Sequence, residues 1–437
     1  MKLDLGSLEL GVATAATQIE GGNVDTNWHR WAASPGKVKD GSTPARAVDH
    51  WNRVDEDIAL LKEMGIRHYR MGVEWARVEP EEGAFDSEAI KHYRDEVKAL
   101  RKAGITPLVT LHHFNNPGWL EDRGAWTRPD TVAVFLRYVS RMVHALKDHV
   151  DEWITINEPN VYPTQAYVFG DWPPGHTSIP EAMTVMSLLA HAHIRAYRLI
   201  HAIQPEAKVG VAQHLRPFDP ANPYNPADIA GAKSMEYLFQ GAIYQAMAYG
   251  RFKLPLKGAS TVTLGKYYDF IGVNYYTRSW VSGVSQGTKP GSVINDLGWE
   301  IYPRGLTRML AMVAKTYPGP VYITENGTPD AADSFRARFL YDHIKAAVDA
   351  GVQRYYHWCF TDNWEWIEGE VPRFGLVEVD YGTQKRTIRE SGRMYADMIA
   401  HGGLTEEAYT RWVEPSGKGS GIEPEPKRYR RPGPPPL

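Results

Sequence analysis

Short apolar segments alternate with amphipathic segments along most of this chain, and this alternation restricts the possible folds more than any other feature. The apolar segments have the length and composition of buried strands, and the segments between them show helical spacing. Strands that alternate with helices build parallel sheets. We predict eight strands, at Glu9–Ala16, His68–Trp75, Thr106–His113, Glu152–Glu158, Ala207–Leu215, Asp269–Tyr276, Pro320–Asn326 and Arg354–Phe360.

The ends of several helices between these strands can be read directly. Asp86 is a favourable N-cap residue, and the apolar side chains after it recur at helical spacing, at Ile90, Tyr93, Val97 and Leu100. Gly104 follows where a C-terminal cap belongs. The same helix–glycine–strand junction recurs at Gly65 and Gly351. Residues 127–130, Thr-Arg-Pro-Asp, predict a capping box at the start of another helix.

Eight parallel strands joined by helices form either a closed barrel or a large doubly wound sheet. No predicted strand is followed by a Gly-x-Gly-x-x-Gly turn, which disfavours the doubly wound alternative. Polar residues gather where the predicted strands end, at Gln18, His113, Glu158, Tyr276 and Glu325. Active sites of barrels lie at this end of the strands. We therefore predict an α/β fold with a single (β/α)8 TIM barrel over residues 1–413.

Charge and composition exclude several classes of partner. The formal net charge is -3, so no nucleic-acid partner is expected. No apolar run approaches the roughly 18 residues of a membrane span, so no membrane partner is expected. The single cysteine, Cys359, and an N-terminus without a secretory pattern predict a cytoplasmic protein. Abundant Trp and Tyr suit carbohydrate, because aromatic rings pack on the C–H faces of sugars.

The last residues of the chain differ in composition from the rest. Residues 414–437 are rich in Pro and Gly and contain four clustered cations, Lys427, Arg428, Arg430 and Arg431. Such segments are usually flexible and solvated. We predict a flexible basic tail after the barrel.

Two segments carry the chemistry, Thr155-Ile-Asn-Glu-Pro159 and Ile323-Thr-Glu-Asn-Gly327. Each places a glutamate at the end of an apolar strand, at the mouth of the predicted barrel. Burial there raises the pKa of a carboxyl group, and a positive neighbour lowers it. Cleavage of a glycoside needs this difference, because one carboxyl must hold a proton while the other stays anionic.

The order of several motifs resembles glycoside hydrolase family 1, the β-glucosidase and β-galactosidase family, from about Leu10 to Ile399, with some features of its archaeal-type branch. The motifs that carry the resemblance are Ala15-Ala-Thr-Gln-Ile-Glu-Gly21, Tyr69-Arg70, His112-His113, Thr155-Ile-Asn-Glu-Pro159, Asn274-Tyr-Tyr276, Ile323-Thr-Glu-Asn-Gly327, Asp362-Asn-Trp-Glu-Trp366 and Arg373-Phe-Gly375.

The resemblance implies a retaining exo-β-glycosidase that acts through a covalent glycosyl-enzyme intermediate. Glu158 matches the acid/base of the family, and Glu325 matches the nucleophile. For a retaining enzyme the two carboxyl groups are expected about 5 to 5.5 Å apart. The implied substrate is a small β-glycoside or oligosaccharide, and no cofactor or metal is implied. The oligomeric state and the natural aglycone are left open.

The resemblance also assigns the residues around the two carboxyl groups. Arg70 and Tyr276 match the pair beside the nucleophile, and we expect them to keep Glu325 ionised. Asn157 matches the residue that holds the sugar 2-hydroxyl, and Asn274 lies near it. Trp358 matches a stacking platform and Phe374 an aromatic wall near the 6-hydroxymethyl group. The residues that match contacts to the other sugar hydroxyls are Gln18, His113, Glu365 and Trp366.

Structural alternatives exist for some of these residues. His112 and His113 resemble a metal pair, but adjacent residues on a strand point to opposite faces. Trp358 and Trp366 are compatible with a purely structural core role. Departures from the family pattern occur at Glu74, Phe114, Asn160, Trp172 and Cys359.

Three functions agree with the sequence to different degrees. The first is hydrolysis of β-D-glucosides, together with β-D-galactosides and β-D-fucosides. The second is transglycosylation through the same intermediate. The third, a sugar-binding protein without catalysis, is disfavoured because both Glu158 and Glu325 are present. An anionic Glu365 is expected to repel a sugar 6-phosphate, which favours unphosphorylated substrates.

Overall fold

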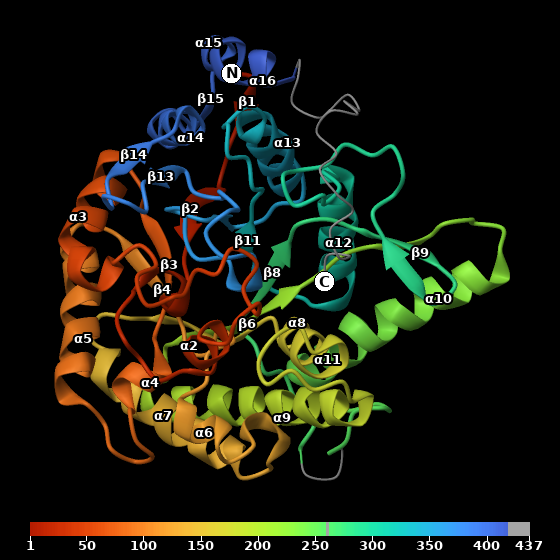
Figure 1. Cartoon of the computed structure of the whole chain (residues 1–437). Helices are drawn as coiled ribbons and strands as arrows, with labels where there is room; N and C mark the ends of the chain where they lie inside the picture. Colours follow the sequence, from red (N-terminus) through yellow and green to blue (C-terminus); the bar gives the residue numbers. More distant parts are fainter. Residues whose placement is uncertain (259–261, 418–437) are drawn as a thin grey trace.

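The computed structural model describes residues 1–258 and 262–417, and its centre is a closed parallel barrel (Figure 1). In this part of the chain, eight strands close the barrel in the order β11-β12-β2-β3-β4-β5-β6-β8. All eight predicted strands are confirmed. They are β2 (Glu9–Ala13), β3 (His68–Gly72), β4 (Thr106–Thr110), β5 (Glu152–Asn157), β6 (Lys208–His214), β8 (Phe270–Tyr275), β11 (Val321–Asn326) and β12 (Arg354–Trp358).

A helix follows each barrel strand along the chain and covers the outside of the barrel (Figure 1). In chain order these helices are α3 (His50–Glu63), α5 (Ser87–Lys102), α7 (Thr131–Leu146), α9 (Ile179–Ile203), α11 (Ala242–Tyr249), α12 (Pro303–Thr316), α13 (Arg336–Asp349) and α14 (Glu390–His401). The structure is therefore a (β/α)8 barrel, as predicted from the sequence.

The local sequence explains where these helices begin and end. The Asp86 carboxylate accepts hydrogen bonds from the Glu88 and Ala89 amides and caps α5 as predicted. Gly104 has a φ of +78° where α5 gives way to β4. The capping box predicted for α7 is wrong. The helix begins only at Thr131, because Thr127, the expected cap residue, donates its hydroxyl to the Gly124 carbonyl instead.

Short elements decorate the barrel. Three small sheets are formed by β1 (Leu3–Asp4) with β15 (Gly403–Leu404), by β7 (Phe218–Pro220), β9 (Ser279–Ser282) and β10 (Ser285–Gly287), and by β13 (Val377–Val379) with β14 (Arg386–Ile388). The shorter helices are α1 (Ala16–Ile19), α2 (Asn27–Ala32), α4 (Trp75–Val78), α6 (Gly118–Glu121), α8 (Val161–Pro163), α10 (Pro226–Glu236) and α15 (Glu406–Ala408). Irregular helical turns are η1 (Ala125–Thr127), η2 (Thr164–Phe169), η3 (Tyr237–Gly241), η5 (Trp366–Glu368) and η6 (Tyr409–Val413).

The register of the barrel is irregular on two strands. The pairing of β5 with β6 shifts between Ile154 and Asn157. The pairings of β11 with β8 and with β12 shift just after Ile323. The other neighbouring pairs of the described barrel show no such shift. Register shifts of this kind turn side chains to new directions and are frequent beside active sites.

The chain after the barrel is described only in part. Helix α16 (Glu414–Gly417) lies within the predicted tail. The rest of that prediction, residues 418–437 with the four clustered cations, lies outside the described residues. Among the residues that are described, no helix has both the length and the apolar character needed to cross a membrane.

Candidate active site

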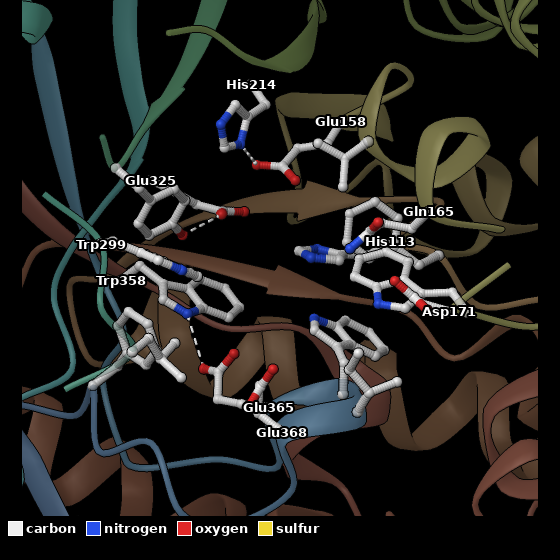
Figure 2. A pocket seen from close by; sticks show the side chains of 18 of the residues that line it. His113, Glu158, Gln165, Asp171, His214, Trp299, Glu325, Trp358, Glu365 and Glu368 are labelled. Atoms are coloured by element: carbon white, nitrogen blue, oxygen red, sulfur yellow. Dashed lines mark hydrogen bonds and ion pairs between the residues drawn. The ribbon is translucent and has the colours of Figure 1, made fainter. Parts of the chain in front are cut away.

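A pocket of about 170 Å³ opens at the carboxyl ends of the barrel strands (Figure 2). Eight of the residues predicted from the sequence line it, namely His113, Glu158, Tyr276, Glu325, Trp358, Glu365, Trp366 and Phe374. Four predicted residues are absent from the lining, namely Gln18, Arg70, Asn157 and Asn274. The last three bond to residues of the lining, and Gln18 bonds to Trp364, the chain neighbour of Glu365. The structure therefore brings the predicted site residues together.

The backbone around the pocket is strained. Glu158, Phe114 and Trp366 all line the pocket and all lie in the left-handed region, with φ values of +44°, +67° and +54°. Residues other than glycine seldom adopt this conformation, which costs of order 1–3 kcal/mol where it occurs. Strain of this kind is maintained where the surrounding structure fixes a functional side chain.

The irregular register of β5 explains how two consecutive residues both serve the site. On a regular strand, Asn157 and Glu158 point to opposite faces. Here β5 shifts register just before Asn157, and Glu158 leaves the strand with a left-handed backbone. Asn157 and Glu158 both accept a hydrogen bond from the same Asn274 side chain. Their polar ends therefore lie on the same side of the barrel wall.

Glu325 has a cation and a phenol as partners. Arg70 Nη1 donates to Glu325 Oε1 over 2.5 Å, and the Tyr276 hydroxyl donates to Oε2 over 2.7 Å. Burial raises the pKa of Glu325 to about 7, although Arg70 and Tyr276 lower it, and the Glu158 carboxylate raises it further. Arg70 and Tyr276 thus act in the direction predicted, but burial outweighs them.

Glu158 has neutral partners, and they bind only one of its oxygens. Asn274 Nδ2 donates to Oε1 over 2.9 Å, and His214 Nδ1 lies 3.2 Å from the same atom. Figure 2 shows the other carboxylate oxygen directed into the pocket. The two glutamates therefore differ in environment, since Glu325 contacts a cation and Glu158 contacts an amide and an imidazole.

A chain of hydrogen bonds fixes the tautomer of His113. Asn157 Oδ1 accepts from Arg70 Nη2 at 2.7 Å and from Asn274 Nδ2 at 3.0 Å. Its Nδ2 therefore donates to His113 Nε2, at 3.0 Å. Burial holds the pKa of His113 well below its ordinary value, so the ring is neutral with its proton on Nδ1. That N–H has no partner among the described residues and is available to a ligand hydroxyl.

A second polar group gathers around Glu365. Trp358 Nε1 donates to Glu365 Oε1 at 3.1 Å. Gln18 Nε2 donates to Asn363 Oδ1 at 3.1 Å and to the Trp364 carbonyl at 2.9 Å, and its buried Oε1 has no partner among the described residues. Burial raises the pKa of Glu365 to about 8. Burial therefore acts against the negative charge expected of Glu365 at pH 7.

Aromatic rings form the walls of the pocket. His113 stacks between Trp358 and Trp366, with centroid distances of 5.8 and 5.9 Å. Trp366 and Phe114 also pack against Trp172. Trp358 and Trp366 therefore face the pocket and do not belong only to the interior.

Sequence reasoning missed several lining residues. They are Lys39, Val161, Gln165, Asp171, His214, Leu297, Trp299, Ile367 and Glu368. His214 could have been found, because it lies one residue before the end of the predicted strand Ala207–Leu215, close to the position that Glu158 and Tyr276 have in theirs. The others come from long loops and short helices, where no periodic pattern marks which side chains face the mouth.

The remaining alternatives concern His112 and Cys359. His112 Nε2 pairs with Asn116 Oδ1, away from the contacts of His113. Within residues 1–258 and 262–417, no group of three or more His, Cys, Asp or Glu side chains is placed to hold a metal ion. Cys359 is buried, burial raises the pKa of its thiol well above the usual value, and it does not line the pocket.

Comparisons with known proteins agree with this geometry. The family model described as glycosyl hydrolase family 1 matches residues 7–404. Beta-glucosidase A of Thermotoga maritima is 33% identical over 91% of this chain and 97% of its own. The beta-galactosidase of Pyrococcus woesei is 28% identical over 91% of this chain and 97% of its own.

A solved structure gives the same result. The beta-glucosidase from Thermotoga maritima in complex with castanospermine superimposes with a TM-score of 0.87 and 30% identity, over 93% of this chain and 100% of that one. The predicted family resemblance is confirmed. The chain belongs to glycosyl hydrolase family 1, and it is a glycoside hydrolase with the β-glycosidase fold of that family.

Proposed function

We propose that this protein is a retaining exo-β-glycosidase that hydrolyses β-D-glucosides, and also β-D-galactosides and β-D-fucosides, with Glu325 as nucleophile and Glu158 as acid/base. The observation that carries this proposal is the unequal environment of the two glutamates. Glu325 receives a guanidinium and a phenol, whereas Glu158 receives neutral donors on one oxygen only.

In the first step, Glu325 attacks the anomeric carbon of the sugar while the bond to the aglycone oxygen breaks. Glu158 gives its proton to that oxygen, so the aglycone leaves as a neutral alcohol and Glu158 becomes a carboxylate. Arg70 Nη1 and the Tyr276 hydroxyl hold the two oxygens of Glu325 and fix its orientation for the attack.

In the second step, Glu158 takes a proton from a water molecule, and the resulting hydroxide attacks the anomeric carbon. The bond between the sugar and Glu325 breaks, and both glutamates return to their starting state. Two inversions give net retention. An alcohol in place of water leads by the same step to transglycosylation.

The reaction needs one proton on the pair of glutamates. Burial and the adjacent Glu158 carboxylate raise the pKa of Glu325 to about 7 against the effect of Arg70. Arg70 and Tyr276 favour the anion on Glu325. The first step needs this proton on Glu158, which contacts an amide and an imidazole and no cation.

The walls of the pocket suit a single terminal sugar. The Nδ1–H of His113 and the Oε1 of Gln18 are buried and have no partner among the described residues, so they are available to hydroxyl groups. Glu365 adds a carboxyl group that donates when protonated and accepts when ionised. Trp358 offers a flat apolar face. The named activities of the relatives, beta-glucosidase and beta-galactosidase, support glucosides and galactosides as the first substrates to test.

The proposal is tested with matched p-nitrophenyl β-D-glucoside and β-D-galactoside. We expect initial rates well above background on both, because the epimers differ in one hydroxyl orientation only. Proton NMR at early times should show the β-anomer of the free sugar as the first product. The same spectra in added methanol measure transfer to an alcohol. A first product with the α-configuration would rule out retention, and no turnover of either sugar would refute the function.

Substrates with a 6-phosphate should be poor, and their discrimination should depend on pH. Lys39, the only Lys or Arg that lines the pocket in the described structure, already pairs with Glu368. We expect kcat/KM for a 6-phosphoglucoside to be about 100-fold below that for the glucoside at pH 7. The ratio should widen as pH rises past about 8, the pKa to which burial raises Glu365, because the ionised carboxyl repels phosphate.

Glu365→Gln is the control for this prediction. It keeps the size of the side chain and removes the ionisable group, so the pH dependence of the ratio should disappear. A ratio that stays constant from pH 6 to 9 in the parent would contradict the role given to Glu365.

The location proposed for the enzyme is the cytoplasm. Cys359 is the single cysteine of the sequence and is buried, so it forms no internal disulfide. Proteins without disulfides suit a reducing compartment.

A further inference from the structure

His214 is a pocket residue for which the proposed reaction has so far required no role. It ends β6, it lines the pocket, and only 5% of its surface is exposed. Its Nδ1 lies 3.2 Å from Glu158 Oε1, and Figure 2 shows this contact above the pocket. The question is what this contact does to Glu158.

The direction of the hydrogen bond follows from the surroundings of the ring. Burial lowers the pKa of His214 below its ordinary value although Glu158 raises it, so the ring is neutral and carries one N–H. Nε2 is buried and has no partner among the described residues. A buried N–H without an acceptor is less tolerable than a bare acceptor. The proton therefore lies on Nδ1 and is donated to Glu158.

The ring is also held in place. It stacks on Tyr276 with a centroid distance of 5.9 Å and an interplanar angle of 27°. It also packs against Phe239 in a T-shaped arrangement, with a centroid distance of 5.8 Å. The His214 carbonyl accepts from Asn160 Nδ2 at 2.8 Å, which anchors the backbone. An imidazole constrained in this way keeps its N–H directed at Glu158.

Two donors therefore meet on the same oxygen of Glu158. Asn274 Nδ2 approaches Oε1 at 2.9 Å, and His214 Nδ1 approaches it at 3.2 Å. An oxygen that already accepts two hydrogen bonds is the carbonyl-like oxygen of a carboxylic acid, so the acid proton belongs on the other oxygen, Oε2. That oxygen is the one directed into the pocket.

We propose that His214, together with Asn274, is a positioning residue that keeps the proton of Glu158 on Oε2, facing the glycosidic oxygen. This inference rests on the proposed role of Glu158 as acid/base. Loss of the His214 N–H allows the proton to occupy Oε1, where it cannot reach the leaving group. It also removes a donor that stabilises the Glu158 anion left after the first step.

Other charged groups act on Glu158 as well. Arg216, which follows β6, interacts electrostatically with Glu158, and so do Tyr276 after β8 and Glu325 on β11. These groups remain when His214 is replaced. A change of the pH profile in a His214 variant is therefore assigned to its own hydrogen bond.

The test compares the parent with His214→Phe and His214→Asn on two substrates. Phenyl β-D-glucoside needs the proton from Glu158, whereas 2,4-dinitrophenyl β-D-glucoside has a leaving group that needs none. Phe fills a similar space without a donor. Asn restores a nitrogen donor at the same number of bonds from Cα as Nδ1.

We expect His214→Phe to lower kcat/KM about tenfold on the phenyl substrate and less than twofold on the dinitrophenyl substrate. The alkaline limb of the pH–rate profile of this variant on the phenyl substrate should move to higher pH, because the Glu158 anion has lost a stabilising donor. His214→Asn should recover most of the loss and the parental limb. Melting temperatures measured alongside show that both variants are folded.

An equal loss on both substrates, or an unmoved alkaline limb, would overturn this inference. Glu158→Gln separates that result from failure of the proposed function. If Glu158→Gln loses activity on the phenyl substrate and retains activity on the dinitrophenyl substrate, Glu158 is the acid. The result for His214 is then interpreted by itself. If Glu158→Gln affects the two substrates equally, the proposed role of Glu158 fails first.

Discussion

Glu325→Gly is expected to lower kcat/KM for p-nitrophenyl β-D-glucoside by about 10⁴-fold or more, because it removes the carboxylate that forms the covalent intermediate. Added sodium azide should restore turnover. The azide ion fits the space that the side chain leaves and attacks the anomeric carbon from the same side as Glu325. The product should therefore be α-glucosyl azide, which NMR distinguishes from its anomer.

Glu158→Ala is the matched control, and its product should have the opposite configuration. This variant should still form the intermediate from 2,4-dinitrophenyl β-D-glucoside, whose leaving group needs no proton. Azide then attacks from the side that Glu158 occupied and gives β-glucosyl azide. The same anomer from both variants would contradict the assignment of the two glutamates, and an exchange of the two anomers would reverse it.

Arg70→Met is expected to have the second largest effect, on both activity and stability. Arg70 is fully buried and donates to Glu325 Oε1 and Asn157 Oδ1. Without the cation, the pKa of Glu325 rises further above its ordinary value, since burial and Glu158 then act unopposed by it. Activity requires ionised Glu325. The acid limb of the pH–rate profile should move to higher pH, and kcat/KM at pH 7 should fall about 10²- to 10³-fold.

The effect on stability has a sign that can be checked. Removal of one partner of a buried ion pair costs about 3–5 kcal/mol. The pKa of Glu325 is higher in the folded state than in the unfolded state. The free energy of unfolding therefore falls as pH rises toward the folded-state pKa. The difference in melting temperature between parent and Arg70→Met should therefore widen from pH 5 to pH 8. An equal difference at both pH values would contradict the role of Arg70 in holding Glu325 as an anion.

Arg386→Met provides the control. Arg386 is buried and pairs with Asp57, and neither residue lines the pocket. This variant should lose stability by a similar mechanism and leave the acid limb of the pH–rate profile unchanged. A shift of the limb in both variants would indicate a general effect of destabilisation.

The fold could be predicted from the sequence because the patterns that mark its strands and helices are local and repeated. Each strand is a short apolar run, and glycines such as Gly104 mark the ends of helices where the backbone becomes left-handed. The two glutamates could be predicted because each lies in a short motif at the end of a strand. The capping box predicted at residues 127–130 failed because the Thr127 hydroxyl donates to the Gly124 carbonyl, which lies outside the motif.

The electrostatics of the site could not be predicted because they depend on burial. Glu365 looks like a surface charge in the sequence, but it lines the pocket beside Trp358, where burial raises its pKa to about 8. Whether Arg70 or burial has the larger effect on Glu325 is likewise a three-dimensional question. The shared orientation of Asn157 and Glu158 also depends on a register shift that no strand periodicity reveals.

The left-handed backbone at Glu158, Phe114 and Trp366 has a consequence for attempts to make this enzyme withstand heat. Each of these positions carries a conformational cost that glycine would not incur. Selection for thermal resistance alone would favour substitutions that remove this backbone strain. Such substitutions would replace Glu158 or the aromatic side chains that line the pocket. A laboratory search should therefore score turnover after heating and leave these three positions unchanged.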